Sequence, residues 1–168
     1  MPQNHENLRK ALSERVLIAD GAMGTMLQAA NPSLDDFQGH EGCNEVLNVT
    51  RPEVVQSVHS AYLEAGVDLI ETNTFGANWA NLAEYGIAER IYEYNFVAAK
   101  LAKEVATDFS NSYERFVIGS MGPGTKLPSL GHVEFSFLRD HYEIQARGLI
   151  EGGADAILVE TSQDLLQT

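Results

Sequence analysis

The stretch Val16-Leu-Ile-Ala-Asp-Gly-Ala-Met-Gly-Thr25 decides the fold, because an apolar run ends on a carboxylate and a turn of small residues follows at once. A run of four apolar residues, with Val and Ile among them, predicts a strand buried on both faces. Gly21 and Gly24 allow the backbone to turn sharply and to approach a ligand closely. We therefore expect Asp20 at the carboxyl end of a strand, where parallel α/β folds place their binding sites.

The same layout recurs three more times, where apolar runs close on Glu71, Ser120 and Glu160. An internal repeat relates residues 64–72 to residues 151–161, since each copy has a helix end, a glycine stop and a buried strand that closes on Glu-Thr. Alternating strands and helices predict a parallel sheet or barrel. We expect an α/β fold of (βα)8 TIM-barrel type, of which this chain covers about the first four βα units.

The pattern also predicts where the elements begin and end. Residues 1–12 are expected to form an N-terminal extension, and residues 13–168 the N-terminal half of the barrel, incomplete at the carboxyl end. Further strands are expected at 67–73 and 156–159, residues 116–123 are expected to form a strand and its turn, and a last helix starts near residue 165. Thr50-Arg-Pro-Glu53 predicts a capping box for a helix that ends at Gly66. The predicted apolar helix faces are Val54, Val55, Val58, Ala61, Tyr62 and Ala65; then Ile91, Tyr94, Ala98, Leu101, Ala102, Val105 and Phe109; then Leu138, Tyr142, Gln145 and Leu149.

Composition excludes several classes of partner. The chain has 168 residues, 44% of them hydrophobic, and 24 acidic against 11 basic residues, which gives a formal net charge of −13. No basic run exceeds Arg9-Lys10, so we expect neither a nucleic-acid partner nor a membrane partner. No apolar stretch reaches the roughly 20 residues that cross a bilayer, and no signal peptide opens the chain, so we expect a cytoplasmic protein. The single cysteine, Cys43, excludes an intrachain disulfide and a multi-cysteine metal site made by this chain alone.

Six short motifs lie at the predicted strand ends and helix starts. They are Asp20-Gly-Ala-Met-Gly-Thr25, Leu47-Asn48, Arg51-Pro-Glu53, Glu71-Thr-Asn-Thr-Phe75, Gly119-Ser-Met-Gly-Pro-Gly-Thr-Lys126 and Val159-Glu-Thr161. Each string alone is common, but their order and their placement are specific. Over residues 13–168 the set resembles the homocysteine-binding modules of cobalamin-dependent methionine synthases, within the homocysteine S-methyltransferase family. Betaine-dependent members share the strand-end motifs, and the segment 122–128 favours the cobalamin-dependent branch.

The resemblance implies a barrel that binds homocysteine at the carboxyl-end mouth and coordinates its sulfur to zinc. Coordination to a divalent cation deprotonates the thiol, and the thiolate is the reactive form. The methyl group would come from methylcobalamin, recharged by 5-methyltetrahydrofolate, and the cobalamin- and folate-binding modules would be partners of this one. Three cysteines hold the zinc in the family, and these are expected beyond residue 168, because Cys43 matches none of them. The resemblance therefore predicts no metal ligand and no catalytic residue in this chain, which alone would be inactive.

Eight residues are expected to contact the substrate on the strength of this resemblance. Asp20 and Glu160 would hold the ammonium group, and the backbone amides of Gly21, Ala22 and Met23 would surround the carboxylate. The other contacts would be Asn73 and Ser120 with the polar end of the substrate and Phe75, together with Met23, over its methylenes.

Each assignment has a structural alternative that the sequence leaves open. Asp20 could cap its own turn, and Glu160 could pair with a Lys or Arg at the barrel rim. Asn73 and Ser120 could only satisfy loop backbone, and direct contact by Glu71 is undecided. Of the histidines, His59 is expected at the surface or in an interface. Asn95 is expected to bond to nearby backbone.

Three other functions stay open besides the enzyme part. A truncated half-barrel without activity of its own could associate with itself or with a complementary fragment, because its sheet would have open edges. A homocysteine methyltransferase could use betaine or another donor. An unrelated small-molecule-binding βα protein is the third alternative.

Overall fold

The computed structural model describes residues 3–110 and 113–168. Within them, three parallel strands pair in the order β1-β2-β3: β1 (Leu69–Glu71), β2 (Phe116–Met121) and β3 (Ala156–Val159). The α-helices are α1 (Gln3–Glu14), α2 (Met23–Ala29), α3 (Leu47–Thr50), α4 (Pro52–Glu64), α5 (Trp79–Glu84), α6 (Ile91–Asp108) and α7 (Phe135–Gly152). Short 3-10 turns cover η1 (Asn44–Val46), η2 (Ala88–Arg90) and η3 (Pro128–Leu130). The predicted class, mixed α/β with a parallel sheet, is confirmed. None of the described helices is long and apolar enough to cross a membrane.

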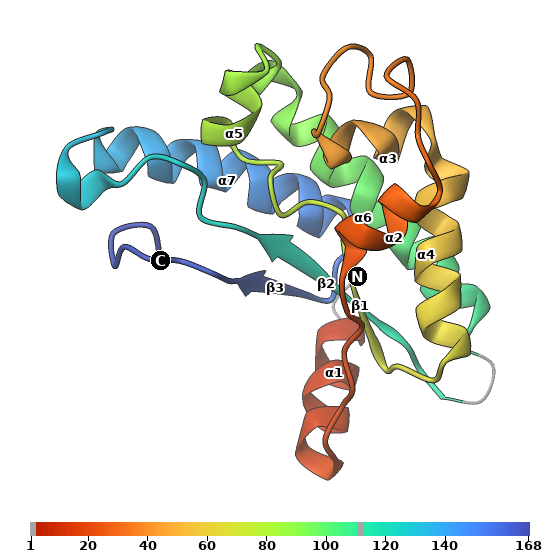
Figure 1. The fold of residues 1–168 in the computed structure, drawn as a ribbon. Helices are drawn as coiled ribbons and strands as arrows, with labels where there is room; N and C mark the ends of the chain where they lie inside the picture. Colours follow the sequence, from red (N-terminus) through yellow and green to blue (C-terminus); the bar gives the residue numbers. More distant parts are fainter. Residues whose placement is uncertain (1–2, 111–112) are drawn as a thin grey trace.

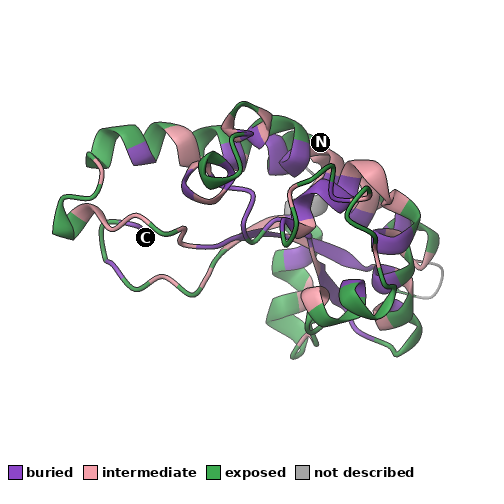
Figure 2. Cartoon of the chain, turned by 45° about the horizontal axis from the view of Figure 1, so that its top comes forward, coloured by how far each residue is buried: buried purple, intermediate pink, exposed green. Residues whose placement is uncertain are grey.

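Helices α4, α6 and α7 lie together on one side of the sheet, and α1 lies on the other side (Figure 1). The main core joins Leu63 of α4, Ile70 of β1, Val117 of β2 and Leu149 of α7 with a row of alanines on α6. A smaller cluster forms around Leu8 of α1, where it meets β1 and β2. Figure 2 shows the buried residues concentrated between the strands and the helices, whereas the segment near the C-terminus is largely exposed or half-buried.

The first predicted strand is wrong in its burial. Residues 16–19 form only an isolated parallel bridge, between Ala19 and Leu69. The exposed fraction of Val16 is 86% and that of Ile18 is 60%, while Leu17 packs on the small cluster around Leu8. A strand buried on both faces needs cover on both faces. The described residues provide it on one face only.

The other three predicted strands are present. The strand and turn expected over 116–123 contain β2, and the strand expected at 156–159 matches β3. The strand expected over 67–73 is shorter in the structure, where β1 covers residues 69–71. The helix expected near residue 165 is replaced by bends and turns.

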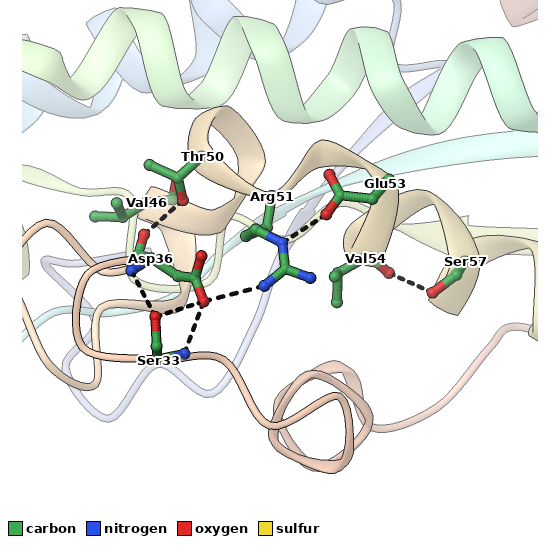
Figure 3. A network of polar contacts seen from close by, with 8 residues as sticks. All are labelled: Ser33, Asp36, Val46, Thr50, Arg51, Glu53, Val54 and Ser57. Carbon is green, nitrogen blue, oxygen red and sulfur yellow. Dashed lines mark hydrogen bonds and ion pairs between the residues drawn. The ribbon is translucent and has the colours of Figure 1, made fainter.

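Helix α4 starts without the predicted capping box. Arg51 is its N-cap residue and Pro52 its first residue, and no side chain caps the helix. The Thr50 hydroxyl instead donates to the backbone oxygens of Asp36, at 2.6 Å, and Val46, at 3.2 Å (Figure 3). Thr50 is the last residue of α3, so its side chain serves the preceding turn.

Arg51 fastens the long loop before η1 to the start of α4 (Figure 3). Its guanidinium contacts Glu53 at 2.5 Å and Asp36 at 3.0 Å. The Asp36 carboxylate also accepts from the backbone N–H and the hydroxyl of Ser33. The loop is thus tied to a helix that packs on the sheet.

His59 lies inside the molecule, and the prediction of a surface position is wrong. Its exposed fraction is 0%, because the buried face of α4 runs through Val54, Val55, Val58, His59 and Leu63, whereas Ala61 and Ala65 are exposed. Neither ring nitrogen has a hydrogen-bond partner in the described part of the chain. Burial lowers the pKa of His59 to about 4.

Helices α6 and α7 match the predicted faces closely. Leu138, Gln145 and Leu149 are buried, and Tyr142 is half-buried against the core. Asn95 donates to the backbone oxygens of Ala77 and Ile91, which confirms the prediction. Leu101 and Phe109, which belong to the predicted apolar face of α6, are only half-buried.

The internal repeat also places one aspartate at the start of β1 and one at the start of β3, at matching positions. Asp68 accepts from the backbone N–H of Ile18 at 2.9 Å and pairs with Arg15. Asp155 accepts from the backbone N–H of Val117 at 2.8 Å and pairs with Lys103. Each carboxylate therefore holds the neighbouring strand in register.

Candidate functional site

A cavity of about 420 Å³ opens at the carboxyl end of the strands. All eight residues that the sequence singled out as substrate contacts lie in its wall. The wall consists of Asp20, Gly21, Ala22, Met23, Gly24, Asn44, Glu45, Glu71, Thr72, Asn73, Thr74, Phe75, Ser120 and Glu160.

Asp20 faces this cavity and not its own turn. Its backbone N–H donates to the carbonyl of Leu69, and its carboxylate oxygens accept from the backbone N–H of Glu71 at 3.0 and 3.1 Å. Burial, together with the nearby charge of Glu71, raises the pKa of Asp20 to about 7. The carboxylate thus accepts from β1, and a bond to it from the turn at residues 21–24 is not seen in the described part of the chain.

Glu160 follows β3 and lies further toward the carboxyl edge than Glu71. Glu71 is opposite Ile118 in the sheet, whereas the Glu160 backbone N–H donates to Met121. The Ser120 hydroxyl donates to the Glu160 carboxylate at 2.5 Å. Burial and the charge of Glu160 raise the pKa of Glu71, which places the two carboxylates within electrostatic reach of each other.

No cation neutralises these three carboxylates in residues 3–110 and 113–168. None of the ion pairs there includes Asp20, Glu71 or Glu160. The alternative of a rim salt bridge to Glu160 is therefore not seen. Carboxylates gathered in a partly buried cavity without a cationic partner are costly, so the arrangement favours a cationic ligand.

Asn73 is held by a pair of reciprocal amide bonds with Asn48. Asn48 donates to the Asn73 backbone oxygen at 2.8 Å, and Asn73 donates to the Asn48 side-chain oxygen at 3.1 Å and to the Asn44 carbonyl at 2.8 Å. Both amide hydrogens of Asn73 therefore serve the protein, as its structural alternative expected. The side-chain oxygen of Asn73 has no donor among the described residues.

Phe75 is 44% exposed, lines the cavity and packs against the turn after β2. The Gly122 backbone N–H donates to the Phe75 carbonyl at 3.2 Å, and a Cβ at Gly122 would lie 2.6 Å from that oxygen. Gly122 is therefore required for close approach, and residues 122–126 lie outside the cavity wall.

The turn after Asp20 presents backbone N–H groups. Those of Gly21, Ala22 and Met23 donate to no protein acceptor in the described part of the chain. The Tyr62 hydroxyl of α4 donates to the Ala22 carbonyl at 3.0 Å and fixes the turn against that helix. Free N–H groups at a turn suit an anion such as a carboxylate.

Sequence reasoning missed Glu45, which is 8% exposed and touches the cavity. One carboxylate oxygen accepts from the Gly76 backbone N–H at 2.7 Å, and the other accepts from the Cys43 thiol at 3.5 Å. Burial raises the pKa of Glu45. A glutamate directly before the apolar pair Val46-Leu47 was the available signal.

Cys43 does not provide a metal site. Its thiol is buried, and burial with the neighbouring Glu45 raises its pKa to about 12. The structure, where it describes the chain, contains no group of three His, Cys, Asp or Glu side chains arranged to hold a metal. The residues present therefore do not fit a zinc ion.

The homocysteine S-methyltransferase family model matches residues 17–168. The chain belongs to this family. It is 56% identical over 162 residues to methionine synthase of Mycobacterium tuberculosis and 53% identical over 166 residues to that of Mycobacterium leprae. These matches cover 96% and 98% of the chain, which spans only 14% of the length of each relative. The predicted resemblance is confirmed, and the alternative of an unrelated βα protein is excluded.

Solved structures of this family support the fold. The metallated form of the homocysteine methyltransferase MmuM from Escherichia coli matches with a TM-score of 0.77 at 22% identity, over 96% of this chain and 59% of that one. Its apo form matches with a TM-score of 0.64 over 90% of this chain and 51% of that one.

Proposed function

We propose that this chain binds homocysteine in the cavity at the carboxyl end of the strands, as part of an enzyme that methylates its sulfur to form methionine. One observation carries the proposal: Asp20, Glu71 and Glu160 line a cavity of about 420 Å³ and have no cation among the described residues. The ammonium group of an amino acid supplies the missing charge. Family membership and the methionine synthase relatives support homocysteine as that amino acid.

The remaining cavity residues divide between the two ends of the ligand. Asp20 and Glu160 hold the ammonium group, and Ser120 orients Glu160 by donating to it. The backbone N–H groups of Gly21, Ala22 and Met23 receive the carboxylate. Phe75, with Met23, covers the methylenes, and Asn73 offers its side-chain oxygen to the polar end.

The larger assembly is also a proposal. Residues 13–168 form the N-terminal half of an eight-strand barrel, and residues 1–12 its extension. Zinc would be held by chain outside these residues and would favour the thiolate form of the homocysteine sulfur. Methylcobalamin and 5-methyltetrahydrofolate act on other modules of a cytoplasmic enzyme, so residues 1–168 alone have no transferase activity. The methionine synthase relatives favour this donor over betaine.

Two variants of the natural full-length protein, Asp20→Asn and Glu160→Gln, test the site. Each loses a charge-assisted hydrogen bond worth about 1.5 to 3 kcal/mol, so the homocysteine dissociation constant should rise about ten- to a hundredfold. Isothermal titration calorimetry measures this. Asp35→Asn and Glu64→Gln change exposed carboxylates away from the cavity and should bind normally. Unchanged affinity in both cavity variants would remove the assignment.

A further inference from the structure

Strand β1 leaves the sheet in an unusual way at Thr72. The Thr74 backbone N–H donates to the Thr72 carbonyl at 2.9 Å, and neither group bonds to β2 in the described part of the chain. Ser120 on β2 would otherwise lose the partners of both its backbone groups. Buried backbone groups almost always keep a partner, and the exposed fraction of Ser120 is only 2%.

The hydroxyls of Thr72 and Thr74 replace the lost backbone partners. The Ser120 N–H donates to Thr72 Oγ1 at 3.1 Å, and Thr74 Oγ1 donates to the Ser120 carbonyl at 2.7 Å. The two threonine oxygens are 2.6 Å apart. The Thr74 proton is already committed to a carbonyl, which can only accept, so Thr72 is the donor between them.

The result is a closed ring with one direction. It runs from the Ser120 N–H through the Thr72 hydroxyl and the Thr74 hydroxyl to the Ser120 carbonyl. Both threonines are buried, with exposed fractions of 3% and 0%, and Gln145 of α7 donates to the Thr74 carbonyl at 3.2 Å. In a buried place each of these bonds is costly to leave unmade.

The ring binds both the backbone N–H and the backbone carbonyl of Ser120, and the Ser120 side chain bonds to Glu160. The Ser120 hydroxyl donates to the Glu160 carboxylate at 2.5 Å, and the Glu160 backbone N–H donates to the Met121 carbonyl at 3.2 Å. We propose that Thr72 and Thr74 are positioning residues, whose hydroxyl ring sets Ser120 so that Glu160 faces the ligand ammonium. This inference rests on the proposed function and adds to it two residues that do not themselves bind the ammonium group.

The test uses valine and serine variants of both threonines in the natural full-length protein. Valine keeps the shape of threonine and lacks the hydroxyl, so Thr72→Val and Thr74→Val should each weaken homocysteine binding about tenfold. Thr72→Ser and Thr74→Ser keep the hydroxyl and should stay within about threefold of wild type. Thr107→Val is the matched control, since its hydroxyl bonds within α6, far from the cavity wall.

A second ligand separates positioning from general damage. 4-Mercaptobutanoic acid is homocysteine without its amino group, so it does not use Glu160. The valine variants should bind it as wild type does, while homocysteine binding falls. Equal losses for both ligands would show a structural role only and would overturn the proposal.

A double-mutant comparison shows whether the threonines act through Glu160. In a Glu160→Gln background, Thr72→Val should cause little further loss of homocysteine binding, whereas independent effects would multiply and contradict the inference. If the valine variants do not fold, Thr72→Cys replaces them. A thiol forms weaker hydrogen bonds than a hydroxyl, so this variant should show a smaller loss of homocysteine binding that is still selective over 4-mercaptobutanoic acid. Wild-type protein that fails to bind homocysteine overturns the proposed function itself, whereas normal wild-type binding with unaffected variants overturns only the role of the ring.

Discussion

Asp20 is charged at a cost in the free protein. Burial and the neighbouring Glu71 raise its pKa to about 7, so close to neutral pH the carboxyl group is about half protonated. An ammonium group beside it would favour the ionised form and lower that pKa. Ligand binding at the cavity is therefore linked to the release of a proton from Asp20.

We predict that homocysteine binds more tightly as the pH rises from 6 to 8, and that binding at pH 6 releases protons. Asp20→Asn should remove the part of both effects that Asp20 causes, while any proton from the ligand stays the same in both proteins. Titration calorimetry in two buffers of different ionisation enthalpy counts the protons. Identical proton release by wild type and variant would contradict the linkage.

His59 makes the fold more stable as the pH rises, which is opposite to the effect of Asp20 on folding stability. Its pKa of about 4 in the folded protein is below the ordinary value of 6.5, because burial disfavours the charged imidazolium. The folded state therefore gains from neutral His59 above pH 6.5 and loses this gain as the pH falls toward 4. The pKa of Asp20 is raised, so its contribution to folding stability is lost as the pH rises from 3.8 through about 7. The two contributions run against each other over one range.

Comparison of wild type with His59→Leu isolates the histidine. Leucine needs no hydrogen-bond partner and cannot charge, so the wild type should lose about 3 kcal/mol of unfolding free energy relative to the variant between pH 7 and pH 4. Urea unfolding at several pH values measures the difference. Parallel stability curves for the two proteins would show that His59 is not the titrating group.

At the scale of elements, helices α6 and α7 approach closely at two glycines one turn apart. A Cβ on Gly148 would lie 2.8 Å from the Tyr92 carbonyl, and one on Gly152 would lie 2.5 Å from the Phe96 carbonyl. Both obstacles are backbone atoms of α6, so they cannot move aside cheaply. This close contact fixes the position of α7 against α6. Gln145 of α7 in turn donates to the carbonyl of Thr74, which lies in the cavity wall.

We predict that Gly148→Ala destabilises the protein by about 1 to 3 kcal/mol, through overpacking against α6. Gly24→Ala is the matched control, because its nearest neighbour would be the Asn44 side chain at 3.4 Å, an ordinary contact distance. Gly24 lies in α2, where alanine favours the helix by up to about 1 kcal/mol. Thermal unfolding compares the two. A stable Gly148→Ala variant would mean that the helices can separate at little cost.

At the scale of the whole molecule, apolar residues remain exposed at both margins of the sheet. Val16 and Ile18 precede the first bridge, and Val159 at the end of β3 exposes 47% of its surface. Sheet margins of this kind associate readily when they have no cover. In a complete barrel, further strands of the same protein would cover these apolar residues. In a self-associating half-barrel, a second copy of the chain would cover them.

Hydrogen exchange distinguishes these two arrangements. If more chain completes a barrel, the amides of residues 16–19 should exchange slowly in the natural full-length protein and fast in a polypeptide of residues 1–168. The half-barrel alternative instead predicts slow exchange in the short polypeptide, with a mass above that of a monomer in light scattering. Fast exchange in both proteins would contradict the proposed barrel.

The sequence by itself determined the chain of strands and helices and the edge at which polar residues gather. Those features follow from local period and glycine stops, and β2, β3, α6 and α7 lie where the pattern predicts. All eight predicted contacts line one cavity, because the carboxyl ends of parallel strands meet at one edge. The family resemblance supplied their roles, which the experiments above test.

Only the tertiary structure decided which groups touch. Burial of His59 depends on which side of α4 meets the core, and exposure of Val16 depends on cover from other segments. The bonds of Thr72 and Thr74 to Ser120 and the bond of Glu45 to Gly76 join residues far apart in the chain over distances of 2.7 to 3.1 Å. Hydrogen bonds of this kind depend on the distance and direction between atoms in three dimensions. The spacing of residues along the chain determines neither of these quantities.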